Sequence, residues 1–292
     1  MRSVRFKRTT IASFEVTNQS VHYVNATVSG LLTPRYQAKQ LFVIPLPPNL
    51  FKEGVLTQTD IFLATLQPYF TDELPKKTVL NIPARWISCY SLTLGTKLSA
   101  EEIETVIKLD LSNRLQIQFE QIYYDYFLQS QDGRLTAFIM FCAAAIINSR
   151  IEALRSLNIN VRQVTTTYVM LITLLSRYTN PRSTLICCED NCVTFVIMEN
   201  KQLIYFDTQP LNSLFIPSVV DTVFTTVANT YDLGSIYLLG ALVEPEMLNG
   251  LQKKYQCNIV SLPMFTQWTW GVSSKPTFES FAICTNLIEQ AI

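Results

Sequence analysis

The sequence predicts an α/β protein with mixed sheets that is built as two related lobes. Each half of the chain begins with strand-like runs and continues with alternating helices and strands. At 292 residues, with 48% hydrophobic and 16% charged residues, the chain is long enough for each lobe to bury a core. The composition therefore predicts a folded globular protein and excludes a disordered one.

Strands open the first half. The runs "TIASFEV", "SVHYVNATVS" and "QLFVIPL" are separated by polar turns and predict an antiparallel meander. The segment "DIFLATLQPYF" has helical spacing, and "TVLNIP" reads as a strand. Ser99 is followed three residues later by Glu102, a capping box that predicts a helix running toward Leu111. The strands "IYYDYFLQS" and "LTAFIMFCA" follow around a "DGR" turn, and then the helix "IINSRIEALRSLN" and the strand "VRQVTTT".

The second half repeats this order. The helix "YVMLITLLSRY" precedes the strand "TLICCED", and "CVTFVIMENKQLIYFDTQPL" predicts a hairpin that turns at "ENKQ". A helix from Ser218 to about Tyr231, the strand "SIYLLG", the helix "PEMLNGLQKKY" and the amphipathic helix "TFESFAICTNLIEQ" complete the chain.

Charge and composition exclude several functions. Lys+Arg and Asp+Glu both number 23, so no net field favours nucleic acid as a partner. No run is apolar for long enough to be a signal peptide or a bilayer span, so we expect a cytoplasmic protein. Cys187, Cys188 and Cys192 read as small apolar strand residues, and no metal site is predicted. His22 is the single histidine and alternates with apolar neighbours in a strand, which indicates a structural or surface role and no catalytic residue.

The order of elements resembles PilM, the actin-like protein family of type IV pilus assembly that includes HofM and is related to FtsA. The segment from "VLNIPARW" to "IYYDYFLQS", with its "EEIE" helix, resembles the inserted subdomain that distinguishes PilM and FtsA from actin. The resemblance implies a two-lobed actin-like fold with that insertion. It divides the chain into a first lobe (1–78, 131–163 and 271–292), an inserted subdomain (79–130) and a second lobe (164–270).

The nucleotide loops of this family are degenerate here. The first loop matches Glu15, Thr17 and Asn18, where Thr17 replaces a glycine that lets backbone N–H groups approach phosphate. The second falls on Glu189, Asp190 and Asn191 or, in a shifted register, on Cys187, Cys188 and Glu189, and neither has a glycine. The adenosine loop falls on Gly240 and Ala241. We therefore expect no ATP hydrolysis, and binding of ATP with Mg²⁺ that is weak or lost.

The resemblance implies a binding protein. Its partner would be the N-terminal cytoplasmic tail of a PilN-like inner-membrane protein, which would hold the chain peripherally at that membrane, with other pilus platform proteins, motor ATPases or its own copies as further partners. An active ATPase or phosphotransferase is the alternative, and an FtsA-like filament former is a third. The aromatic and polar residues of the insertion predict the peptide groove: Asn81, Arg85, Trp86, Tyr123, Tyr124 and Tyr126.

Overall fold

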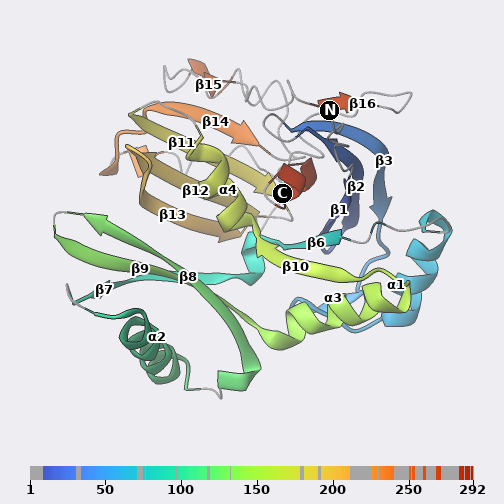
Figure 1. The fold of residues 1–292 in the computed structure, drawn as a ribbon, viewed down its shortest axis with the longest axis horizontal. Coiled ribbons are helices and arrows are strands. Elements are labelled where there is room, and N and C mark those ends of the chain that lie inside the picture. The colour runs from blue at the N-terminus through green and yellow to red at the C-terminus, as the bar shows by residue number, and fades with distance from the viewer. Residues whose placement is uncertain are drawn as a thin grey trace, which may run out of the picture.

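The computed structural model arranges the chain in three main sheets (Figure 1). It describes residues 9–30, 34–70, 75, 77–95, 98–116, 119–131, 133–177, 181–189 and 192–210, together with 225, 227–228, 230–239, 250, 252–253, 259–260, 268–270, 283–285, 287–289 and 291. Among these residues the sheets have six, five and three strands, and a short two-stranded pair is formed by β4 (Phe51–Lys52) and β5 (Val55–Leu56).

The six-stranded sheet has the order β10-β6-β1-β2-β3-β16. Its strands are β1 (Thr9–Val16), β2 (Ser20–Ser29), β3 (Arg35–Pro45), β6 (Lys77–Ile82), β10 (Val161–Thr166) and β16 (Trp268–Trp270). The predicted antiparallel meander of β1, β2 and β3 is confirmed, and β6 adds to β1 in parallel. Successive side chains of a strand point to opposite faces, so Ile11, Ser13 and Glu15 share one face of β1, and Ala12 and Phe14 the other.

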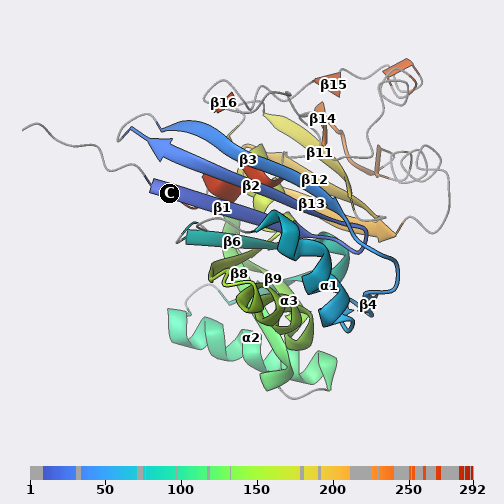
Figure 2. The same ribbon diagram turned by 90° about the vertical axis from the view of Figure 1, so that its right-hand side faces the viewer.

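Helices cover one face of this sheet. They are α1 (Thr59–Leu66), which continues into the 3₁₀ turn η1 (Gln67–Tyr69), and α3 (Ala144–Ser156). Phe62 and Leu66 of α1 and Leu154 of α3 are buried in one cluster with Phe14 and Tyr23 of the sheet. Figure 2 shows α1 and α3 below the blue strands.

The five-stranded sheet has the order β13-β12-β11-β14-β15. Its strands are β11 (Arg182–Glu189), β12 (Cys192–Glu199), β13 (Gln202–Pro210), β14 (Ser235–Leu239) and β15 (Ile259–Val260). The hairpin predicted at "ENKQ" is confirmed, with Asn200 and Lys201 at positive φ (50° and 66°) between β12 and β13. Two successive positive φ angles are the conformation that matches the twist of a two-residue hairpin.

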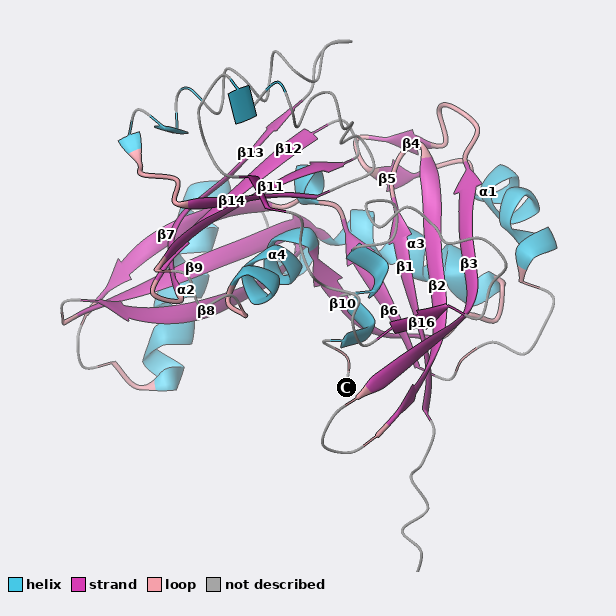
Figure 3. Cartoon of the chain, turned by 90° about the horizontal axis from the view of Figure 1, so that it is seen from above, coloured by secondary structure: helices cyan, strands magenta, loops and turns pink. Residues whose placement is uncertain are grey.

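One core joins the two large sheets. Helix α4 (Thr167–Leu175) packs between them, and its Met170, Leu171 and Leu174 share a buried cluster with strands of both sheets. The same cluster includes Ile283, Cys284, Leu287, Ile288 and Ala291. Figure 3 shows the two large sheets side by side, with α4 beside the second. The predicted helices at 218–231, 245–255 and 277–290 lie largely outside the described residues, although the described residues 283–285 and 287–289 are helical.

The three-stranded sheet has the order β7-β9-β8 and is covered by helix α2 (Ala100–Leu115). Its strands are β7 (Ser88–Leu94), β8 (Ile122–Gln131) and β9 (Arg134–Ala143), preceded by the 3₁₀ turns η2 (Ala84–Trp86) before β7 and η3 (Phe119–Gln121) before β8. The predicted capping box is confirmed: Ser99 Oγ accepts from the backbone N–H of Glu102, and the Glu102 carboxylate accepts from the N–H of Ser99.

Strand pairing differs from the predicted subdomain boundaries. Residue 79 falls within β6, which pairs with β1 and β10 in the first-lobe sheet. Residue 130 falls within β8, whose partner β9 would then lie in another domain, although β9 pairs only within the small sheet. We therefore propose that the inserted subdomain is residues 87–143, because each of its described strands pairs within it. The sequence pattern alone does not decide between these two sets of bounds, because β6, β8 and β9 are all strand-like runs and only their pairing assigns each to a sheet.

The small subdomain is tied to the second lobe by a side chain. Gln129 of β8 donates through Nε2 to the carbonyl of Leu203 (3.2 Å) and accepts from the Leu203 N–H through Oε1 (2.7 Å).

In the described part of the chain, no helix is long and apolar enough to span a bilayer.

Candidate functional site

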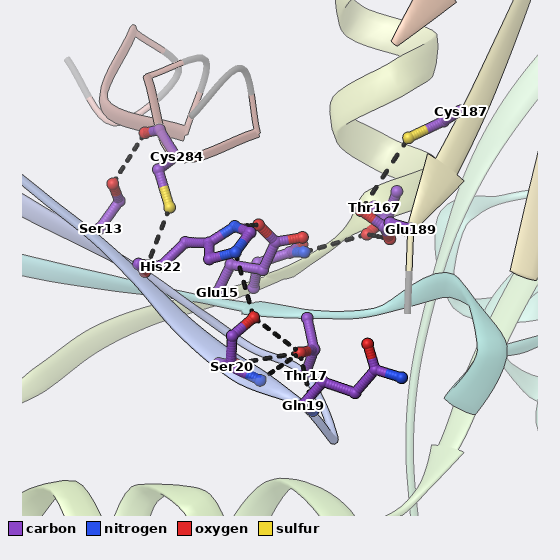
Figure 4. Close-up of polar contacts among 11 residues, drawn as sticks. Ser13, Glu15, Thr17, Gln19, Ser20, His22, Thr167, Cys187, Glu189 and Cys284 are labelled. Atoms are coloured by element: carbon purple, nitrogen blue, oxygen red, sulfur yellow. Dashed lines mark hydrogen bonds and ion pairs between the residues drawn. The ribbon is translucent and has the colours of Figure 1, made fainter. Parts of the chain in front are cut away.

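The hairpin of β1 and β2 brings three polar side chains together at the point where the two large sheets face each other (Figure 4). Glu15 and His22 are opposite each other in the β1–β2 register. His22 Nδ1 lies 3.0 Å from Glu15 Oε2, and its Nε2 lies 3.1 Å from Ser20 Oγ. Glu15 and His22 are buried, with 2% and 9% of their surface exposed, whereas Ser20 is half-buried.

The electrostatics of this group favour a neutral imidazole. Burial lowers the pKa of His22, and the nearby charge of Glu189 raises it by less. With the ring neutral, Nδ1–H donates to Glu15 and the unprotonated Nε2 accepts from the Ser20 hydroxyl. This arrangement satisfies both ring nitrogens.

Thr17 occupies the turn between the two strands. Its Oγ1 accepts from the backbone N–H groups of Gln19 (3.2 Å) and Ser20 (3.0 Å) and donates to the Ser20 carbonyl (3.0 Å). Phosphate-binding loops present such N–H groups to the ligand. Here the threonine hydroxyl takes them, so the turn is closed by its own side chain.

A second hydrogen-bonded group lies across from the first. Thr167, the first residue of α4, donates through Oγ1 to Glu189 Oε1 (2.6 Å) at the end of β11. The same hydroxyl accepts from Asn81 Nδ2 of β6 (2.9 Å). Thr167 and Asn81 have no exposed surface, and Glu189 is 5% exposed. This relay joins the first-lobe sheet to the second through buried hydrogen bonds.

The first loop does not fit a nucleotide phosphate. The N–H groups of Gln19 and Ser20 are satisfied by Thr17, and the Glu15 carboxylate is bonded to His22. The Glu189 carboxylate is bonded to Thr167. A phosphate would have to displace these contacts, and two buried carboxylates would stand beside it. Asp190, Asn191, Gly240 and Ala241 lie outside the described residues.

The cysteines predicted to be apolar lie inside the second sheet. Cys187, Cys188 and Cys192 are buried in β11 and β12, and burial raises the pKa of the Cys188 thiol to about 12. Within the described ranges no three His, Cys, Asp or Glu side chains are grouped so that they could hold a metal ion.

A separate cavity of about 540 Å³ lies where the small subdomain meets the first lobe. Three successive residues of β8 line it (Tyr123, Tyr124 and Asp125), as do Gln163–Thr166 of β10. In the described sheets, β8 and β10 are both edge strands. Because four successive residues of β10 line the cavity, its backbone edge borders the cavity along with one face of its side chains. The remaining lining residues are apolar: Ile87, Met140, Phe141, Cys142, Ile147, Ile151 and Val169.

The residues predicted to form a peptide groove fall into separate places. Tyr123 and Tyr124 line the cavity. Asn81 lies in the buried relay, and Tyr126 packs on the core of the small sheet. Trp86 packs against Gly54, and the Arg85 guanidinium lies 4.6 Å from the centre of the Trp86 ring.

Sequence reasoning missed Ser20 and Thr167, and assigned His22 no partner. The sequence does carry a signal for the Glu15–His22 pair. Residues at equal distance from a hairpin turn face each other, and Glu15 and His22 are equally far from the turn at 17–20. Thr167 has no such local signal, because its partners are 86 and 22 residues away.

The arrangement of the two large sheets identifies the fold. Two facing sheets joined by buried helices, each sheet beginning with a β-hairpin, form the actin-like ATPase fold, as predicted. A solved structure described as a protein with actin-like ATPase fold and unknown function, from Bacteroides thetaiotaomicron, is similar to this chain with a TM-score of 0.54 at 12% identity; the match covers 86% of this chain and 90% of that one.

A more particular likeness is to the PilM-PilN type IV pilus biogenesis complex, with a TM-score of 0.75 at 11% identity over 96% of this chain and 98% of that one. The predicted resemblance to PilM is confirmed at the level of the fold. The cytoplasmic domain of EpsL, an inner-membrane component of the type II secretion system of Vibrio cholerae, matches with a TM-score of 0.50 at 9% identity over 97% and 94% of the two chains. By sequence, neither a family model nor a curated protein matches.

Proposed function

We propose that this protein is an adaptor that binds an extended peptide, the N-terminal tail of a PilN-like membrane protein, in the cavity between β8 and β10. The observation that supports this most strongly is the cavity itself, which is bordered by two sheet-edge strands. An extended peptide can add to such an edge through main-chain hydrogen bonds, while pockets select its side chains. The similar fold in the PilM-PilN complex supports the choice of partner.

The lining of the cavity sets the chemistry of the peptide. Asp125 is the one charged residue among the lining residues, and it is exposed. The apolar wall accepts aliphatic or aromatic anchors, and the carboxylate favours a basic neighbour over an acidic one. Tyr123 stands at the opening with 50% of its surface exposed, and its hydroxyl donates to Asn148 Oδ1 of α3 (3.1 Å). An exposed tyrosine beside an apolar pocket is a typical binding anchor.

The adaptor works without nucleotide in this proposal. Thr17 takes the backbone donors of the first loop, and the relay from Asn81 through Thr167 to Glu189 links the lobes by direct contacts. Both features support a cleft that is filled by side chains. Attachment to a membrane protein through the peptide would place the chain at the cytoplasmic face of the inner membrane, beside other components of a pilus or secretion platform.

Isothermal titration calorimetry with the PilN-like N-terminal tail peptide from the same genome tests this proposal. We expect binding that Tyr123→Ala weakens about tenfold or more, as for an anchor worth over 1.4 kcal/mol. Tyr69→Ala is the matched control, because Tyr69 is also exposed (40%) and lies in η1 outside the cavity. Asp125→Lys should weaken the binding of a tail peptide that carries a basic residue. Absence of peptide binding, or equal affinities for the two tyrosine variants, would contradict the proposal.

A further inference from the structure

Ser20, His22 and Glu15 have the mutual geometry of a nucleophile, a base and an orienting acid. Ser20 Oγ lies 3.1 Å from His22 Nε2, and His22 Nδ1 lies 3.0 Å from Glu15 Oε2. The hydroxyl and the carboxylate thus bond to opposite nitrogens of one imidazole, as nucleophile–base–acid groups require. Such groups recur on unrelated folds and are recognised by this geometry.

The exposure of the three residues increases from Glu15 through His22 to Ser20. Ser20 and His22 are two residues apart on β2, so their side chains share the face of the sheet that looks toward the second lobe. Glu15 and His22 are buried, and Ser20 at the start of the strand is half-buried. The base and the acid are therefore shielded from water, whereas Ser20, whose Oγ also lies 3.3 Å from Thr17 Oγ1, is partly exposed at the start of the strand.

We propose that Ser20 is a nucleophile that His22 activates, and that this group takes the acyl unit of small, uncharged esters. The neutral ring expected from the burial of His22 is the form that accepts a proton. The charged and titratable groups around it are Glu15 on β1, Glu189 on β11 and the thiol of Cys284, which donates to the His22 carbonyl. The Glu15 and Glu189 carboxylates disfavour anionic substrates, and an uncharged ester avoids this repulsion.

The reaction has two balanced steps. Ser20 Oγ bonds to the acyl carbon, its proton passes to His22 Nε2, and the ester C–O bond breaks as that proton passes to the departing alcohol. Water then attacks the acyl group with His22 as base, and the acid and the free Ser20 hydroxyl are released. Glu15 is a positioning residue, because it holds the ring with Nε2 toward Ser20. This activity is independent of the proposed peptide binding.

The test is the rate at which the full chain is labelled by a fluorescent alkyl fluorophosphonate, followed by peptide mass spectrometry, and its hydrolysis of p-nitrophenyl acetate. We expect one adduct, on Ser20, and none in Ser20→Ala. His22→Gln should label about 100-fold more slowly, the lower range of general-base catalysis. Ser29→Ala is the control, because Ser29 is a half-buried serine of the same strand and should label as the wild type does.

The pH profile of wild-type labelling needs no variant. We expect the rate to follow one ionisation with its midpoint below pH 6.5, since burial lowers the pKa of the only histidine, and Glu15→Gln should move that midpoint. Labelling elsewhere, no labelling at all, or a rate that keeps rising tenfold per pH unit above pH 7 would overturn the proposal. In that case the three residues serve only to fill the turn.

Discussion

Replacing Thr167 by valine should destabilise the protein strongly, because one buried hydroxyl makes both hydrogen bonds of the relay between the lobes. Valine keeps the shape of threonine and removes only the hydroxyl. The lost bond to the Glu189 carboxylate (2.6 Å) is worth about 1.5–3 kcal/mol, and the lost bond from Asn81 (2.9 Å) about 0.5–1.5 kcal/mol. Because all three residues are buried, water cannot replace these bonds, and we expect a loss of about 2–4.5 kcal/mol.

Urea denaturation followed by circular dichroism measures this loss as a lower midpoint at an unchanged slope. The control is Thr105→Val on the exposed side of α2, where the hydroxyl donates to the Glu101 carbonyl of its own helix. That substitution should change the free energy of unfolding by at most about 0.5 kcal/mol. If Thr167→Val costs no more than the control, the relay does not hold the lobes together.

Three further substitutions test separate parts of the structure. Gly54→Ala should clearly lower the thermal unfolding midpoint, because Gly54 has φ +82° and an added Cβ would lie 2.6 Å from a ring carbon of Trp86. Gly133→Ala is the control for backbone strain alone, because Gly133 has φ +75° and no atom lies within 4 Å of an added Cβ. Ser99→Ala should cost about 1 kcal/mol through loss of the α2 cap, and a helix stability unchanged by it would contradict the capping geometry. The pKa of His22 in the folded state lies below its unfolded value of 6.5, so the contribution of His22 to stability is complete above pH 6.5 and is lost as the pH falls through the folded-state pKa. The single imidazole signal in NMR should therefore titrate below pH 6.5. His22→Gln should flatten the dependence of stability on pH in this range.

Local signals in the sequence were sufficient for much of the fold. The capping box at Ser99 and Glu102, the turn at Asn200 and Lys201, and the β1–β2–β3 meander each depend on residues close in sequence. Their physical basis is local hydrogen bonding and backbone conformation, which neighbouring residues fix. For this reason they could be predicted one element at a time.

The site depends on contacts that no local pattern encodes. Asn81 was predicted in the peptide groove because it precedes the aromatic segment, but the parallel register of β6 between β1 and β10 turns it toward Thr167. The cavity combines β8 with β10, segments about forty residues apart. Thr17 was recognised as a lost glycine, but its capture of two backbone N–H groups appears only in the folded turn.

We propose an adaptor whose peptide groove works without nucleotide. The most direct measurement is a calorimetric titration of the purified protein with the PilN-like tail peptide, repeated after millimolar Mg-ATP has been added. We expect no heat from Mg-ATP and the same peptide affinity in both titrations, because Thr17 already takes two backbone N–H groups of the first loop and Glu189 is already bonded to Thr167. Tight binding of Mg-ATP, or a peptide affinity that changes with it, would show that nucleotide regulates the adaptor.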